Sequence, residues 1–305
     1  MDSLLTLLAQ QSINGIYLGC MYVMVALGLT LIYGVMNQIN FAHSDFVTLG
    51  AFAALFVATR VAAHWLGLPD TAAYLLSIVF AFGAGALLGF LINAAVFAPL
   101  RNRSDELRPL IATIGVSVLL ENGLLALVGP TPFQFDSPFS RESIRLGGIF
   151  LTQQTLLVIG VTILAVAALY AFLKFTFVGK ALRAVAQDRE TAGLVGINPA
   201  LLIGLTIMIA SGLAGMAGAM LGPVMVLTPF AGATVIVKAF AVVIIGGFGN
   251  IDGTILAGLL VGLVEAMTVQ YLGSGMTDLV VFGLLLITLA IRPTGLIAER
   301  REVNV

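Results

Sequence analysis

The chain has 305 residues, of which 60% are hydrophobic and only 10% are charged, and its formal net charge is -1. A soluble domain is about a quarter charged, so this chain has too few ionisable groups for a water-facing surface, and its neutral balance offers nucleic acid no basic field. Its single cysteine, Cys20, cannot form an internal disulfide. Composition therefore excludes a soluble enzyme, a nucleic-acid-binding protein and a disulfide-stabilised secreted domain, and it predicts an all-α polytopic integral membrane protein.

Apolar runs long enough to cross a membrane occur along the whole chain. A helix needs about 20 mostly apolar residues to span roughly 30 Å of hydrocarbon. The candidate runs are 12–35, 43–63, 71–97, 107–128, 153–175, 200–227, 234–249, 253–271 and 276–292. The run 234–249 is short and ends in a glycine-rich stretch. We therefore expect about 8–10 transmembrane helices in one domain over 1–305, with broken or re-entrant segments.

The basic residues predict how these spans are oriented, because cytoplasmic loops are enriched in Lys and Arg. Nine spans place ten basic residues on one side: Arg101, Arg103, Arg108, Lys174, Lys180, Arg183, Arg189, Arg292, Arg300 and Arg301. The opposite side has three, which are Arg60, Arg141 and Arg145. This bias predicts an N-terminus outside the cell and a C-terminus in the cytoplasm.

Two polar loops are longer than a simple connection requires. The external loop at about 129–152 is rich in proline and predicts an irregular lid or docking surface. The cytoplasmic loop at about 176–199 contains one predicted amphipathic helix, 180–195, whose apolar side includes Leu182 and Val185. That apolar side has no lipid to cover, so we favour a helix that docks a partner. The alternative is a solvated connection whose positive charges only satisfy the orientation rule.

The first polar cluster within the predicted spans is the segment 37–45, NQINFAHSD. Asp45 and His43 at the membrane edge are costly unless they face water or one another. One interpretation is a broken helix that lines a translocation pathway, with Asn40 and Phe41 on it. The other is a cytoplasmic turn in which Asn40 caps the next helix and Asp45 favours its N-terminus. The two interpretations are compatible.

Three more ionisable residues lie inside apolar runs. Lys238 and Glu265 occupy neighbouring runs, where each would be costly alone and the two can pair. Glu121 is a third intramembrane acid. A structural salt bridge and a contact with a transported solute both fit this pattern, so all three join the candidate pathway residues.

Glycine accounts for 34 residues, and four pairs have the small-residue spacing that lets helix backbones approach closely. We interpret these pairs first as packing contacts within the chain. They are Gly15 with Gly19, Gly85 with Gly89, Gly218 with Gly222 and Gly258 with Gly262.

Catalytic motifs are not readable in the sequence. The Gly179-Lys180 pair is followed by Ala181 and lacks the rest of a phosphate-binding loop, and neither a nucleophile elbow nor a zinc-binding His-Glu-x-x-His helix occurs. With His43 and His64 as the only histidines, we predict no catalytic residues, no metal site and no cofactor bound by this chain.

Segments spread over nearly the whole chain resemble the permease subunits of branched-chain amino acid ABC importers, especially the H-type subunit of the leucine/isoleucine/valine system. These segments are 28–35 (GLTLIYGV), 39–43 (INFAH), 179–188 (GKALRAVAQD), 194–198 (LVGIN), 246–253 (GGFGNIDG), 262–265 (GLVE) and 292–296 (RPTGL), together with Lys238. Ser44 departs from the pattern, because the family commonly has glycine there.

The resemblance implies a permease domain without enzyme activity in an ATP-driven importer of branched-chain or other hydrophobic amino acids, working by alternating access in a bacterial inner membrane. It implies a homologous second permease, two cytoplasmic ATPases that bind ATP and Mg, and an extracytoplasmic solute-binding protein as partners, with lipid around the chain and no nucleic acid. The predicted cytoplasmic helix then corresponds to the family's coupling helix. Its expected residues are Gly179, Lys180, Leu182, Arg183, Gln187, Asp188 and Gly196.

Two other interpretations stay open from the residues. The same architecture could import amides, urea or aromatic carboxylates. A secondary carrier could act alone with Asp45, Glu121, Lys238 and Glu265 as its charge relay. Such a carrier would not need the cytoplasmic helix, so dependence on ATPases distinguishes the two classes.

Overall fold

The computed structural model describes residues 2–100, 107–146 and 148–297, and most of these are helical. The α-helices are α1 (Asp2–Met36), α2 (His43–Phe56), α3 (Asp70–Ile92), α4 (Ala98–Leu100), α5 (Leu107–Val128), α6 (Gln153–Phe175), α7 (Phe177–Gln187), α8 (Arg189–Leu194), α9 (Pro199–Leu221), α10 (Gly232–Gly246), α11 (Ile251–Tyr271) and α12 (Thr277–Ile291). Two π-helical stretches, η1 (Val57–Trp65) and η2 (Asn93–Phe97), extend α2 and α3. Short 3-10 turns are η3 (Pro138–Ser140) and η4 (Ser274–Met276), and the strands are β1 (Ser143–Leu146) and β2 (Ile149–Thr152).

Eight helices of the described residues are long and apolar enough to cross a membrane. They coincide with eight of the nine predicted runs, and the ninth run forms the shorter apolar helix α10. At 1.5 Å per residue, the 15 residues of α10 extend about 22 Å, which is less than the roughly 30 Å of hydrocarbon. The chain is therefore a polytopic all-α membrane protein, as the sequence predicted, and its described residues include one apolar helix too short to span alone.

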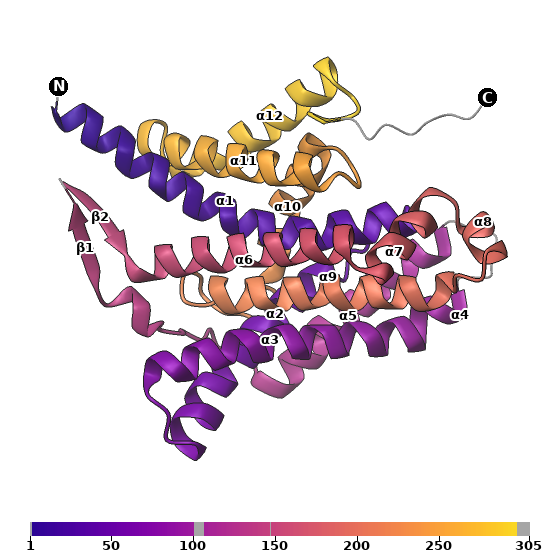
Figure 1. Cartoon of the computed structure of the whole chain (residues 1–305). Coiled ribbons are helices and arrows are strands. Elements are labelled where there is room, and N and C mark those ends of the chain that lie inside the picture. Colours follow the sequence, from indigo (N-terminus) through magenta and orange to yellow (C-terminus); the bar gives the residue numbers. More distant parts are fainter. Residues whose placement is uncertain (1, 101–106, 147, 298–305) are drawn as a thin grey trace.

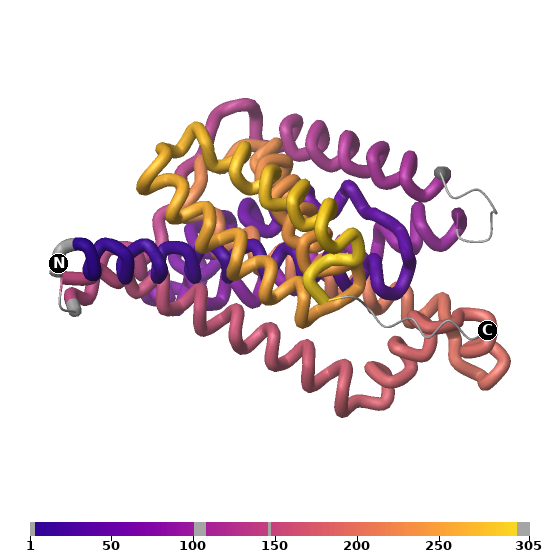
Figure 2. Tube along the Cα trace, turned by 90° about the horizontal axis from the view of Figure 1, so that it is seen from above, coloured from indigo at the N-terminus to yellow at the C-terminus, as the bar shows by residue number. Residues whose placement is uncertain are grey.

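The spans lie side by side with their ends gathered at two opposite sides of the molecule (Figure 1). The start of α1 and the β1–β2 hairpin lie at one end, and α7 and α8 lie at the other (Figure 1). The amides of Leu296 and Ile297 donate to the carbonyls of Ile245 and Gly246 at the end of α10. Residues 296 and 297 therefore also lie at the α7–α8 end of the bundle. Seen from above, α5 and α6 run along opposite edges of the bundle (Figure 2).

The glycine pairs make contacts within the chain, as predicted. A Cβ atom built on Gly262 of α11 would lie 2.3 Å from the Gly19 nitrogen of α1, and one on Gly19 would lie 2.9 Å from the Gly258 oxygen. Two small-residue motifs thus face each other and bring α1 and α11 together. Gly85 on α3 is in the same way closely apposed to Ser211 of α9.

The loop 129–152 is more ordered than the predicted irregular lid. Its β1–β2 hairpin is tied to α1, because Gln10 donates to the Phe150 carbonyl at 3.0 Å and accepts from the Phe150 amide at 2.7 Å. Further along, Ser137 donates to Gln154, which donates to the Tyr74 hydroxyl in the core of α3. Proline content indicated an irregular backbone, but it did not reveal these long-range anchors.

Candidate functional site

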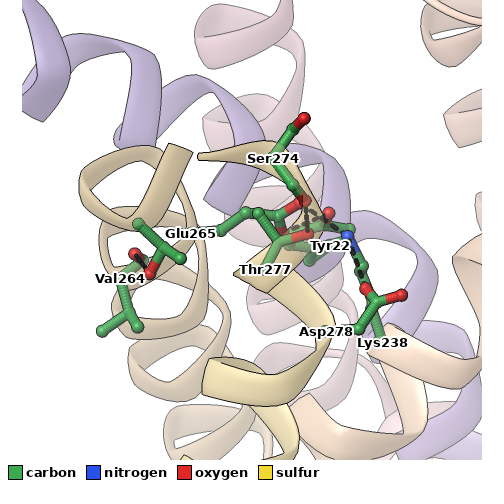
Figure 3. A network of polar contacts seen from close by, with 8 residues as sticks. Tyr22, Lys238, Val264, Glu265, Ser274, Thr277 and Asp278 are labelled. Carbon is green, nitrogen blue, oxygen red and sulfur yellow. Dashed lines mark hydrogen bonds and ion pairs between the residues drawn. The ribbon is translucent and has the colours of Figure 1, made fainter. Parts of the chain in front are cut away.

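The candidate pathway residues Lys238 and Glu265 form an ion pair. Lys238 Nζ on α10 donates to Glu265 Oε1 on α11 at 2.6 Å. The Tyr22 hydroxyl on α1 donates to Glu265 Oε2 at 2.7 Å, and Lys238 Nζ also lies 3.5 Å from Asp278 Oδ1 on α12. Figure 3 shows the four side chains meeting at one point, where four helices converge.

Each oxygen of the Glu265 carboxylate therefore accepts a short hydrogen bond, whereas the contact of Asp278 with Lys238 is longer. The Glu265 side chain is 10% exposed and that of Lys238 is 18% exposed, but that of Asp278 is 69% exposed. Lys238 Nζ also lies 5.9 Å from the Tyr22 ring centre, within range of a cation–π contact. We refer to Tyr22, Lys238, Glu265 and Asp278 as the Lys238 cluster.

The sequence did not predict Tyr22 and Asp278 as members of this cluster. Asp278 had a readable signal, since it is a lone acid in the run 276–292 and lies in the first turn of α12. That position also favours the helix N-terminus, so it did not suggest a partner. Tyr22 had no signal at all, because an aromatic residue in a span is ordinary.

One face of α10, beside Lys238, is exposed, and we call it the bare face of α10. Ala233, Thr234 and Val237 are exposed and Phe240 is partly exposed. At 100° per residue, Lys238 lies at one edge of this face and Phe240 at the other. Phe240 contacts the Phe41 ring ahead of α2, with 5.6 Å between ring centres. With 15 residues, α10 is too short to cross the hydrocarbon alone, so the backbone at its ends must be covered by protein or line a water-filled cavity.

Residues 37–42 connect α1 to α2 as a compact turn, and His43 and Asp45 belong to the first turn of α2. The Asn40 side chain accepts from the Ala42 amide at 3.1 Å, and the Asn40 carbonyl accepts from His43 N at 3.3 Å. His43 is fully buried against α1, where its Nε2 lies 3.2 Å from the Val25 carbonyl. Asn40 and His43 are thus held within the chain, but the predicted cap is wrong, because the N-cap of α2 is Ala42 and has no side-chain hydrogen bond. Phe41 is 40% exposed towards α10.

Asp45 faces a polar stripe on α5. The stripe consists of Thr113, Ser117 and Glu121, spaced four residues apart on one side of the helix. The Phe41 amide donates to Thr113 at 3.3 Å, and Ser117 and Glu121 both lie near enough to Asp45 to influence its charge. Asp45 is buried, and its Oδ2 has no hydrogen-bond partner among the described residues.

The predicted single helix 180–195 is wrong, because the chain breaks at Asp188 into α7 and α8. Asp188 is extended, with φ -152° and ψ 111°, and its Oδ1 accepts from the amides of Glu190 and Thr191 at 2.9 and 3.1 Å. The Thr191 hydroxyl adds a bond at 2.5 Å. These bonds, led by the one from the Thr191 side chain, hold the pKa of Asp188 below its ordinary value. The residue that we placed mid-helix is an N-cap.

The apolar side of α7 is also not available to a partner, contrary to the prediction. Leu182 and Val185 are buried against the chain's own spans, while Val195 is 71% exposed and Leu194 is 88% exposed. The break at Asp188 rotates α8, so Val195 does not continue the buried side. Arg189 donates to the Val35 carbonyl at 2.7 Å and ties α8 to the end of α1.

The remaining coupling-helix candidates divide into structural and surface positions. Gly179 lies where a Cβ would be 2.3 Å from the Phe172 carbonyl, and Gly196 ends α8 with a φ of +84°, so both need glycine. Lys180, Arg183 and Gln187 are exposed. Arg183 also lines a cavity of about 390 Å³ between α7 and the ends of α1, α6, α9 and α11.

The described basic residues follow the predicted two-sided distribution. Lys180, Arg183 and Arg189 belong to α7 and α8, and Arg141 precedes the hairpin at the opposite end. The predicted residues Arg101, Arg103, Arg300 and Arg301 lie outside the described residues. Among the described residues, no three His, Cys, Asp or Glu side chains are grouped to hold a metal ion.

The fold and these sites define a class of protein, a polytopic all-α membrane permease. Its family model is described as the permease component of the branched-chain amino acid transport system, and it matches residues 11–290. The chain belongs to this family of ABC transporter permeases.

Two of its relatives match nearly end to end. The high-affinity branched-chain amino acid permease protein LivH of Escherichia coli K12 is 34% identical, covering 97% of this chain and 96% of its own. The corresponding protein BraD of Pseudomonas aeruginosa is 34% identical over 97% of each chain. A solved inward-facing structure of a metal-chelate type ABC transporter shares the fold, with a TM-score of 0.51 and 15% identity over 93% of this chain and 85% of that one.

Proposed function

We propose that this chain is one of two transmembrane subunits of an ATP-driven importer that carries branched-chain or other hydrophobic amino acids. Family membership and the activity of LivH and BraD, which match over nearly their whole length, support this assignment. The second subunit is a homologous permease. Two ATPases bind at the α7–α8 end, and a solute-binding protein delivers the solute at the hairpin end.

In this proposal the α7–α8 end is cytoplasmic and the N-terminus lies outside, in a bacterial inner membrane. The distribution of Lys and Arg supports that orientation, because α7 and α8 alone contain Lys180, Arg183 and Arg189. The ATPases carry ATP and Mg, and this chain contributes no catalytic group. The motion is alternating access, in which ATPase closure rotates the spans against each other and a reset reverses the rotation.

The observation that carries the proposal is the shape and surface of the α7–α8 element. It lies at one end of the bundle (Figure 1) and presents Leu194 and Val195 to its surroundings. Large apolar side chains that are exposed beside charged residues mark a protein-binding surface. Arg189 hydrogen-bonds to the end of α1, and Gly179 packs closely against α6. A movement of the α7–α8 element is therefore transmitted to the spans.

We place the solute pathway along the bare face of α10, between the Asp45–α5 stripe and the Lys238 cluster. The second permease closes this face from the other side. The charges support the placement, since intramembrane ionisable groups face the interior of a bundle or water rather than lipid. His43 then positions the α2 turn against α1 without touching the solute.

Affinity purification of the chain from native membranes tests the assembly. We expect ATPases and a second permease to co-purify with the natural protein. Leu194→Ser/Val195→Ser should lose the ATPases but keep the second permease, because only the docking surface changes. The matched control Leu201→Ser alters an exposed residue of α9 and should keep both. Purification of the natural chain without any ATPase would contradict the proposal.

A further inference from the structure

The Lys238 cluster has one carboxylate more than its charge balance requires. Lys238 and Glu265 neutralise each other at 2.6 Å, and Tyr22 satisfies the second Glu265 oxygen. Asp278 adds a negative charge whose only cation within 4 Å among the described residues is the already engaged Lys238. The cluster therefore has a net charge of -1 and exposes that charge at Asp278.

A structural role accounts for Glu265 and Tyr22 but not for this arrangement of Lys238 and Asp278. An ammonium has three donors, and Lys238 directs one to Glu265 and one towards Asp278. One donor and most of the Asp278 carboxylate remain open beside the bare face of α10. Asp70 shows a helix-start acid without such an arrangement, since it is in the first turn of α3 and its one ion pair among the described residues is with the exposed Arg141, at 3.7 Å.

We propose that Lys238 and Asp278 recognise the two charges of a zwitterionic amino acid as it passes along the α10 face. The solute carboxylate accepts from Lys238, and the solute ammonium donates to Asp278. Glu265 and Tyr22 are positioning residues that hold the Lys238 ammonium in place. This inference rests on the proposed function and specifies which of the possible solute classes the site accepts.

The neighbouring surface suits the rest of such a solute. Val237 is exposed on the same side of α10 as Lys238, and the Phe41–Phe240 ring pair borders the other edge. An aliphatic side chain can lie there while its charged end stays at the cluster. A solute with a carboxylate but no ammonium meets a net negative cluster, and an uncharged amide makes neither ionic contact. The cluster thus favours amino acids over aromatic carboxylates, amides and urea.

The test uses the whole importer in proteoliposomes, with leucine uptake and ATP hydrolysis measured together. Asp278→Asn should reduce leucine uptake per ATP hydrolysed at least tenfold, because one charge-assisted contact is worth roughly tenfold or more. Asp278→Glu should restore much of it. The matched control Asp70→Asn removes an equally exposed acid from another helix start, 66% against 69%, and should transport as the natural protein does.

Hydrolysis stimulated by the loaded binding protein is the readout that a structural role would change. If Asp278→Asn lowers hydrolysis and uptake by the same factor, or changes neither, the inference is overturned. Competition adds a second readout: 4-methylpentanoate, which is leucine without its ammonium, should inhibit at least tenfold less than leucine, and equal inhibition would contradict the inference. If the unmodified importer carries no amino acid at all, the proposed function itself fails, which is a different result.

Discussion

Replacing Lys238 by methionine should destabilise the folded chain strongly. The substitution keeps the length and apolar stem of the side chain but removes the charge that lies 2.6 Å from Glu265. Among the described residues, Glu265 would then keep the Tyr22 hydroxyl alone as a close partner, at 2.7 Å. Breaking a buried ion pair by removing one partner costs about 3–5 kcal/mol, because the other charge stays buried.

The partial exposure of Lys238, at 18%, places the expected loss at the lower end, about 3 kcal/mol. This equals roughly a 100-fold change in the unfolding equilibrium. The double variant Lys238→Met/Glu265→Gln should recover most of the loss, since a neutral amide can still accept from Tyr22. The control Lys180→Met removes an exposed lysine from α7 and should change stability by less than about 0.5 kcal/mol.

Unfolding of the purified assembly by sodium dodecyl sulfate in mixed micelles, followed by far-UV circular dichroism, measures these differences. The natural protein, Lys238→Met, Glu265→Gln and the double variant form a double-mutant cycle, so the coupling between the two residues is read directly. The reasoning is refuted if Lys238→Met costs no more than Lys180→Met. It is also refuted if the double variant loses the sum of the two single losses.

Three further predictions address packing, capping and orientation. Gly262→Val should prevent close approach of α1 and α11 and abolish recovery of folded protein. The control Gly83→Val should fold, because a Cβ atom there has no neighbour within 4 Å. Equal yields of the two variants would contradict the packing assignment. Asp188→Ala should speed amide exchange in α8, whereas Asp188→Asn should not. Because the pKa of Asp188 is lowered, the natural cap should protect α8 at neutral pH and fail only in acid, as the pH falls through that lowered value. Loss of protection near pH 6 would refute this. In a Cys20→Ala background, Gly193→Cys should react with an impermeant maleimide only in inside-out vesicles, and labelling of intact spheroplasts would reverse the orientation.

Structural features could be predicted from the sequence where their residue pattern has a single physical explanation. The apolar runs located the spans, because hydrocarbon thickness sets a helix length. The two facing glycine motifs of α1 and α11 were predicted as internal packing, since only small residues permit backbones so close. Lys238 and Glu265 were singled out together because a lone charge in a span is costly.

The failures occurred where one residue supports two structures. Asp188 fits both an amphipathic helix and an N-cap, and hydrogen bonds with Glu190 and Thr191 decided for the cap. That local choice rotated α8 and placed Val195 outside, so the predicted docking side was wrong. Asp278 joined the cluster through the fold of α10 between α2 and α12, which no spacing along the chain reveals.

Uptake of radiolabelled leucine by vesicles that contain the reconstituted importer, with and without enclosed Mg-ATP, tests the central claim most directly. An ATP-driven importer should show uptake that requires ATP, persists without an ion gradient, and is lost in Leu194→Ser/Val195→Ser although the two permeases still assemble. Uptake by this chain alone, driven by a proton or sodium gradient and independent of ATP, would contradict it and identify a secondary carrier.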